Sequence, residues 1–118
     1  MMDCRFENQL GSYTVNEEVV LKVAGYAALE CYGIVGMASK RSTDGIVQIL
    51  GLENIGRGVI IHIDDNNSVD VELYIIVEYG ISISAVAETL IDTVKYKIEY
   101  LTGVHVKTVN VTVEDIRV

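Results

Sequence analysis

The run of residues 69–79 constrains the fold most strongly, because apolar and polar side chains alternate along it. Its odd positions are all valine, leucine, isoleucine or tyrosine, whereas Asp70, Glu72 and Glu78 occupy even positions. A period of two residues is typical of a β-strand with one buried face. Residues 65–68 have the composition of a turn, and residues 59–64 before them favour another strand. The sequence therefore predicts an antiparallel hairpin.

A first helix is predicted before this hairpin, over residues 17–32. Asn16 can cap the free N–H groups at its start, and Glu17 and Glu18 suit the positive end of the helix dipole. Gly33 is expected to end the helix. Its apolar residues lie on more than one face, which indicates that the helix is covered on more than one side.

A second helix is predicted after the hairpin, over about residues 85–101. Ser82 or Ser84 is expected to cap its start, and Gly103 to end it. Its apolar residues recur at helical spacing along one side, which is the pattern of a helix with a single core face.

Three further segments complete the assignment. Residues 104–113 predict a final strand whose apolar residues change phase, so we expect a bulge near Lys107. Residues 45–50 predict a short helix. Residues 1–10 show no clear pattern and are assigned to a loose N-terminal segment.

These elements predict one α+β domain of two layers, in which two long helices cover one face of a three-stranded mixed sheet. The length of 118 residues suits a single domain. Because the second helix connects residues 69–79 to the final strand, these two strands should be parallel. We expect the final strand to lie beside residues 59–64, which puts the first strand of the hairpin in the middle of the sheet.

The acidic composition argues against several classes of partner. The chain has 17 acidic and 9 basic residues, so its net charge is −8. Nucleic acids and anionic lipids attract basic surfaces, and we expect this chain to bind neither by charge. No stretch approaches the ~20 apolar residues of a membrane span, and the N-terminus lacks the apolar run of a signal peptide. These features predict a cytoplasmic protein without direct membrane insertion.

The sequence contains no recognisable catalytic or metal-binding pattern. His62 and His105 lack a second ligand at the spacing of a zinc site. The acidic residues near position 65 resemble a calcium loop, but the central glycine and terminal glutamate of such a loop are missing, which favours a hairpin turn. Cys4 and Cys31 are too few for a disulfide scaffold and are expected to be reduced. We therefore expect no enzyme activity, no metal and no cofactor.

The glycine-rich residues 51–58 suggest a phosphate-binding loop. However, no Gly-Lys-Ser or Gly-Lys-Thr follows, and the segment leads into a strand rather than into a helix. Flexibility of the loop is the simpler explanation of its glycines.

A candidate partner-binding surface is predicted on the outer side of the hairpin. It combines an apolar centre with an acidic rim, as protein interfaces do. Its residues are Ile60, His62, Glu72, Tyr74 and Ile76. The hydrophobic fraction of 50% and the apolar first helix also favour self-association, so we expect a homo-oligomer.

Several segments together resemble one bacterial protein family. They are residues 16–20, 23–30 and 33–38, then Asp44-Gly45, Gly51, Gly58-Val59, residues 71–80, Thr102-Gly103 and residues 109–113. Over residues 10–118, the chain resembles the alkaline shock protein family, the envelope stress response proteins found mostly in Gram-positive bacteria. It lacks the long charged tail of the alkaline shock protein itself and so resembles the short members of the family.

The resemblance implies a small, non-enzymatic, cytoplasmic protein without catalytic residues. Some members lie at the membrane through an anchoring partner and contribute to envelope homeostasis. Others are linked to fatty-acid or phospholipid metabolism, including control of acetyl-CoA carboxylase, and short members are often encoded near a fatty acid kinase. The expected partner is a protein, either a membrane anchor or a lipid-metabolism enzyme. The alternative is a binding protein for an acyl or phosphorylated ligand, or an accessory subunit of a fatty-acid-metabolism enzyme.

Overall fold

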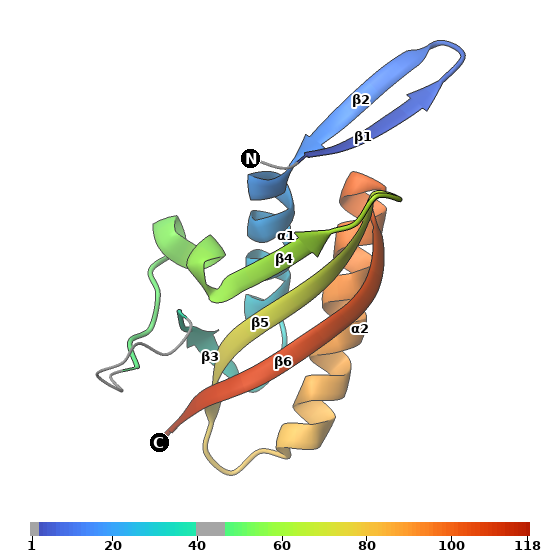
Figure 1. Ribbon diagram of the computed structural model, residues 1–118. Helices are drawn as coiled ribbons and strands as arrows, with labels where there is room; N and C mark the ends of the chain where they lie inside the picture. The colour runs from blue at the N-terminus through green and yellow to red at the C-terminus, as the bar shows by residue number, and fades with distance from the viewer. Residues whose placement is uncertain (1–2, 40–46) are drawn as a thin grey trace.

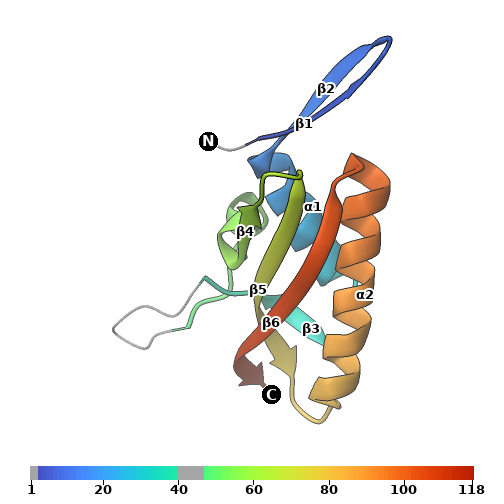
Figure 2. The same cartoon turned by 45° about the vertical axis from the view of Figure 1, so that its right-hand side comes forward.

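The computed structural model describes residues 3–39 and 47–118 (Figure 1). Two long helices lie against one face of a sheet, and a two-stranded hairpin projects from one end of the molecule (Figures 1 and 2). The elements in chain order are β1 (Asp3–Asn8), β2 (Gly11–Asn16), α1 (Glu17–Leu29), β3 (Ile34–Met37), the 3-10 helix η1 (Leu52–Gly58), β4 (Val59–Ile63), β5 (Ser68–Glu78), α2 (Ile83–Thr102) and β6 (His105–Arg117). The predicted two-layer α+β fold with a mixed sheet is confirmed, but the main sheet has four strands among the described residues rather than the predicted three, because β3 joins it.

Strand β5 is the centre of the main sheet. It pairs with β6 in parallel along its length, and its other edge pairs antiparallel with β4 and then with β3. The predicted parallel alignment of the last strand is confirmed, but the predicted strand order is wrong, because β5 rather than β4 lies in the middle. Length explains the difference. β4 has 5 residues and could pair with less than half of the 13 residues of β6, whereas β5 has 11.

Both long helices begin at a predicted capping residue, and α2 also ends at the predicted one. Asn16 Oδ1 accepts a hydrogen bond from the Glu18 N–H at 2.8 Å, and Ser82 Oγ accepts one from the Ala85 N–H at 3.3 Å. α2 ends where Gly103 adopts the left-handed conformation, with φ of 78°. A residue with a side chain would adopt that conformation only at a cost of about 1–2 kcal/mol.

Two predictions for the chain before β4 differ from the structure. α1 ends at Leu29 rather than near residue 32, because the chain turns there to enter β3, a strand too short for its pattern to reveal. Of the short helix expected over residues 45–50, residues 45 and 46 lie outside the described residues. The remaining residues are not helical, and Ile49 forms an isolated antiparallel bridge with Ala38.

The predicted bulge in the last strand is confirmed. The register of β6 against β5 shifts at Lys107, and the shift lets both Val106 and Val109 bury their side chains. Lys107 Nζ lies 2.7 Å from Asp64 Oδ2, and this contact holds the pKa of Asp64 at about 2, well below its usual range. The same carboxylate accepts hydrogen bonds from two N–H groups of the turn between β4 and β5. Asp64 therefore stabilises a turn, as predicted.

The core fills the space between the sheet and the two helices. Its largest buried side chains are Met37, Leu73, Ile75, Leu90 and Ile98. The glycine-rich segment closes one side of this core, because residues 52–58 form η1 and bury Ile55 against α1. A Cβ atom at Gly58 would lie 2.9 Å from the carbonyl oxygen of Ala38. Close packing, rather than loop flexibility, is what requires glycine at this position.

The hairpin of β1 and β2 is fixed to the rest of the molecule at its base. Cys4 of β1 is fully buried and Val15 of β2 is nearly so. Asn67, in the turn between β4 and β5, pairs its side chain with the backbone of Arg5. Its Nδ2 donates to the Arg5 carbonyl oxygen at 2.8 Å, and its Oδ1 accepts from the Arg5 N–H at 3.4 Å. Residues 3–8, for which the sequence indicated only a loose segment, thus form a paired strand.

Replacement of Asn67 tests this anchor. Asn67→Gly keeps the positive φ of 59° accessible but removes the side-chain amide, and we expect it to lower the free energy of unfolding by about 1 kcal/mol. It should also speed hydrogen exchange of the Arg5 amide. Asn67→Ala should cost about 1 kcal/mol more, because alanine disfavours this backbone conformation. Urea titrations measure both differences, and equal stability of Asn67→Gly and wild type would show that the anchor contributes nothing.

Candidate protein-docking surface

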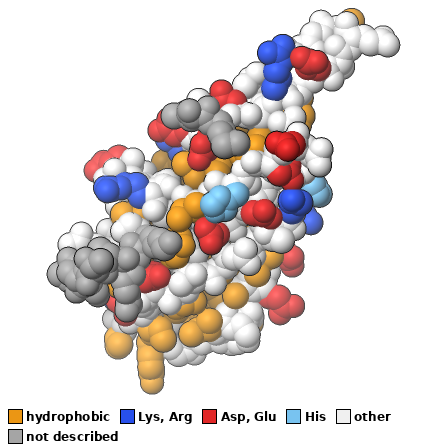
Figure 3. Space-filling view, viewed as in Figure 1, with side chains coloured by type: hydrophobic (Ala, Val, Ile, Leu, Met, Phe, Trp, Pro, Cys, Tyr) orange, Lys and Arg blue, Asp and Glu red, His pale blue; other side chains and the backbone are white. Residues whose placement is uncertain are grey.

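The five residues predicted to bind a partner do not form one exposed surface. Ile60, His62 and Glu72 lie on the outer face of the sheet and are exposed or half-buried, with His62 Nε2 3.6 Å from Glu72 Oε2. Figure 3 shows histidine and acidic side chains gathered over this face. Tyr74 and Ile76 belong to the same face, but they are only 7% and 0% exposed. The prediction of an exposed apolar centre is therefore wrong for these two residues.

Two segments distant in sequence meet near the part of β5 that holds Tyr74 and Ile76. Residues 47–50 return beside β3, at the level of the sheet where β3 pairs with this part of β5. Arg117, at the end of β6, donates from Nη2 to the carbonyl oxygen of Val47 at 3.2 Å. Because β3 and β6 lie on opposite edges of β5, this hydrogen bond spans the central strand. The alternation of side chains along one strand does not reveal such a contact between distant segments.

The two histidines and two cysteines of the sequence lie apart in the structure or are buried. No group of three or more histidine, cysteine, aspartate and glutamate side chains there could hold a metal ion. His105 Nδ1 lies 3.1 Å from Glu99 Oε2 and so joins β6 to α2. Cys4 and Cys31 are buried, and burial together with nearby carboxylates raises the pKa of the Cys4 thiol, which disfavours the reactive thiolate. Within the same residues, no helix is long and apolar enough to cross a bilayer.

A groove of about 300 Å³ lies between α1 and α2, on the side of these helices that is away from the sheet. We call it the helix-face groove. Its apolar lining consists of Val19, Val23, Tyr26 and Ala27 from α1 and Leu101 from α2. Its rim carries Lys22, Glu30 and Lys97. Lys97 Nζ and Glu30 Oε2 face each other at 3.8 Å.

Small residues of α1 explain why the groove is hollow. Positions 24, 25, 27 and 28 are alanine or glycine, and all four are buried. On one side of the helix, a Cβ atom at Gly25 would lie 3.0 Å from Ile55, so η1 packs closely there. On the groove side, Ala27 lies among the larger side chains of Val23, Glu30 and Leu101 and leaves a depression in the surface.

The groove exposes large apolar side chains to solvent. Tyr26 is 46% exposed and Leu101 is 60% exposed. Tyr96 and Tyr100, further round α2, are also exposed and stack with their ring centroids 5.7 Å apart. Exposed aromatic and aliphatic side chains within a charged rim are typical of a protein interface. The sequence signal for this surface was the spread of apolar residues around the first helix, which the outer-hairpin prediction did not use.

The chain is similar to a family of bacterial proteins along nearly its whole length. Residues 5–118 match the model of the alkaline shock protein 23 family, described as having a cell envelope-related function. The uncharacterized protein YloU of Bacillus subtilis (strain 168) is 41% identical over 118 residues, which cover 99% of this chain and 98% of YloU. The uncharacterized protein Spy1614 of Streptococcus pyogenes serotype M6 is 32% identical over 118 residues, which cover 99% of this chain and 97% of Spy1614.

A more distant relative matches most of the chain as well. The uncharacterized protein YqhY of Bacillus subtilis (strain 168) is 27% identical over 111 residues, which cover 94% of this chain and 81% of YqhY. No solved structure matches the chain. Together, the family model and the similarity to YloU show that the chain belongs to the alkaline shock protein 23 family, whose function is related to the cell envelope.

Proposed function

We propose that this chain is a non-enzymatic, protein-binding component of cell envelope homeostasis, and that a protein partner docks on its helix-face groove. The observation that carries the proposal is the solvent-exposed apolar lining of the groove, with Tyr26 and Leu101 at its surface. The cell envelope enters the proposal because the family to which the chain belongs has a cell envelope-related function. In this proposal the chain acts in the cytoplasm, in the envelope stress response or in regulation of lipid metabolism, and its partner is a membrane anchor or a lipid-metabolism enzyme.

Replacement of Leu101 tests the proposal. Leucine is 60% exposed at this position, so Leu101→Asp should leave the fold intact while placing a charge in the apolar lining. Buried apolar anchors at the centre of an interface contribute about 2 kcal/mol or more, so a docked partner should bind at least tenfold more weakly. The matched control is Leu52→Asp, at a leucine of η1 that is 63% exposed and outside the groove.

The measurement is chemical cross-linking in the native host, followed by quantitative mass spectrometry of the captured proteins. We expect at least one envelope or lipid-metabolism protein to be captured by the wild type and by Leu52→Asp but lost with Leu101→Asp. Identical sets of captured proteins for all three chains would contradict the proposal. Circular dichroism of each purified chain verifies that the fold is retained.

Binding of an acyl ligand is a second candidate function, favoured by the two lysines on the rim of an apolar groove. A carboxylate or phosphate could pair with Lys22 while its acyl chain lies on the apolar lining. However, the groove has only the smallest volume usual for ligand pockets, about 300 Å³, and much of its lining is open to water. Saturable thermal stabilisation by a fatty acid, lost in Lys22→Ala, would favour this function.

A further inference from the structure

The hairpin of β1 and β2 extends beyond the body of the protein as an arm. The molecule measures 53 × 29 × 22 Å, and the long dimension includes this projection (Figures 1 and 2). The base of the arm is buried at Cys4 and Val15, whereas Leu10 at its tip is 98% exposed. An isolated two-stranded hairpin is only marginally stable in water. The tip of the arm therefore projects into solvent without support from the rest of the fold.

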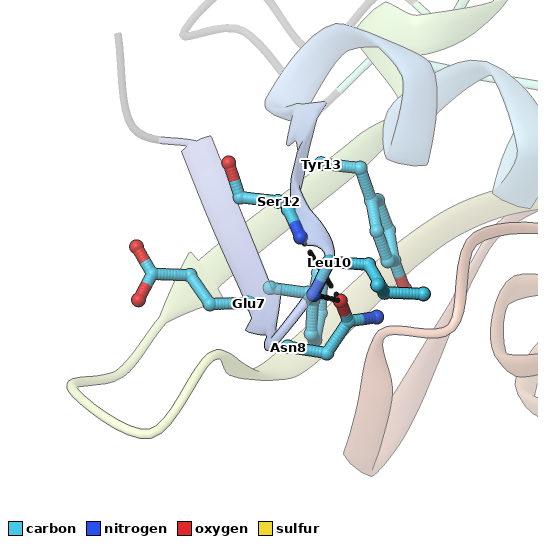
Figure 4. Close-up of a pocket in the computed structure, with 7 residues that line it drawn as sticks. Glu7, Asn8, Leu10, Ser12 and Tyr13 are labelled. Atoms are coloured by element: carbon cyan, nitrogen blue, oxygen red, sulfur yellow. Dashed lines mark hydrogen bonds between the residues drawn. The ribbon is translucent and has the colours of Figure 1, made fainter.

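One face of the arm is apolar from its base to its middle and is interrupted by Asn8 near the tip. Phe6 and Tyr13 are paired residues of β1 and β2, and their rings stack with centroids 4.9 Å apart. They share a strand face with Cys4 and Val15, because side chains on one face recur every second residue. Beyond the rings, a hollow of about 290 Å³ is lined by arm residues, with Leu10 at its end (Figure 4). Phe6 packs partly against the core, so the apolar surface of the arm that meets solvent consists of the half-exposed ring of Tyr13 and the side chain of Leu10 at the tip.

The tip holds Leu10 in a defined position. Asn8 Oδ1 accepts hydrogen bonds from the Leu10 N–H at 2.8 Å and from the Gly11 N–H at 3.1 Å, and these close the turn (Figure 4). An ordered tip loses little conformational entropy when it docks, which favours binding.

We infer that the apolar face of this arm docks in the helix-face groove of a second copy of the chain, and that the second copy returns the same contact. The inference rests on the proposed function, because it uses the same groove and names its occupant. In a reciprocal pair, one two-fold axis relates the two arm-to-groove contacts. The arm and the groove lie close together in each chain, because Tyr13 Oη of the arm lies 3.4 Å from the carbonyl oxygen of Thr102, the neighbour of Leu101 in the groove.

The exposed part of the arm is short enough for the groove. From Phe6 to Asn8, where β1 ends, the strand spans about 7 Å, and Leu10 lies in the turn just beyond. From Val19 to Glu30, the groove residues of α1 span about 16 Å along the helix axis. The arm cannot turn back to fill its own groove while the Asn67 anchor and the buried base hold it.

Charge also favours this contact over others between two acidic copies. With a net charge of −8, two chains repel each other in general. The arm over residues 3–16 carries two acidic residues and one basic residue, so its net charge is −1. The groove rim carries two lysines and one glutamate, so its net charge is +1. The groove is thus a place where an acidic arm can approach without repulsion.

A complementation experiment tests the exchange of arms. Leu10→Asp damages the arm and leaves the groove intact, whereas Leu101→Asp damages the groove and leaves the arm intact. We expect the wild type to sediment at about twice 13.0 kDa, and each variant alone to dimerise at least tenfold more weakly. In an equimolar mixture, the intact arm of one variant meets the intact groove of the other. The mixture should therefore form dimers more tightly than either variant alone.

Sedimentation equilibrium of each chain and of the mixture measures these affinities, with Leu52→Asp as the control that should dimerise like the wild type. A monomeric wild type at millimolar concentration would overturn the inference. So would a mixture that associates no better than its components, or a Leu10→Asp chain that dimerises normally. If Leu10→Asp dimerises normally while Leu101→Asp loses a host partner, the proposed function stands and the arm exchange is wrong. If neither variant changes dimerisation or capture, both proposals are wrong.

Discussion

Replacing Ile76 with aspartate is expected to unfold the protein under conditions in which the wild type is fully folded. Ile76 is 0% exposed in the central strand, where Gly36 of β3 and Asp115 of β6 are its paired neighbours. A carboxylate at this position would lose its hydration beside an existing negative charge. The cost should be about 4 kcal/mol or more, which is a large part of the 5–15 kcal/mol that stabilises a typical domain. Far-UV circular dichroism and urea titration measure the loss.

The control is His62→Asp, on the exposed part of the same sheet face. We expect this change to alter the free energy of unfolding by less than about 0.5 kcal/mol, because the side chain meets mostly water. A cooperative transition for Ile76→Asp at the wild-type midpoint would show that the outer face is open in solution. Ile76 and Tyr74 would then again be candidates for partner binding.

Leu73→Ala should have the second largest effect, a loss of about 2–5 kcal/mol in the free energy of unfolding. Leu73 is fully buried in the core, and β5 is held by Val59 on one edge and Val111 on the other. Because both edges are hydrogen-bonded, the strand cannot move to fill the cavity, and we expect a value in the upper half of this range. Calorimetry or urea titration measures the change.

Leu52→Ala is the matched control for Leu73→Ala. The side chain of Leu52 is 63% exposed, so its removal should change stability by less than about 0.5 kcal/mol. Similar losses for the two variants would contradict the placement of Leu73 in the core and the central position of β5.

The long elements were predictable because each has a strong local signal. The alternation over residues 69–79 indicated β5, and the residues that cap and end α2 indicated that helix. Strand order was not predictable in the same way, because hydrogen bonds between strands depend on their relative lengths. The deciding fact is that β6 reaches Arg117, four residues beyond its predicted end, and only β5 matches that length.

The arm was missed although its residues do alternate. Cys4 and Phe6 alternate with Arg5 and Glu7, but β1 and β2 each contain only two apolar or aromatic residues among six, whereas β4, which was predicted, contains four among five. Tyr74 and Ile76 were wrongly predicted to be exposed for a different reason. Periodicity identifies the face of a sheet to which a side chain belongs, but it does not show whether a distant segment covers that face.

The central position of β5 also has a consequence for synthesis of the chain. β3 and β4 leave the ribosome before β5, and both hydrogen-bond only to β5 in the main sheet. At about 5–20 residues per second, β3 waits about 2–8 seconds for its partner residues in β5, and β4 waits about 0.5–2 seconds. β6 comes last and covers the remaining edge of β5. The nascent chain therefore passes through a period in which its apolar strands are unpaired. During this interval it exposes the most apolar surface to which a chaperone could bind.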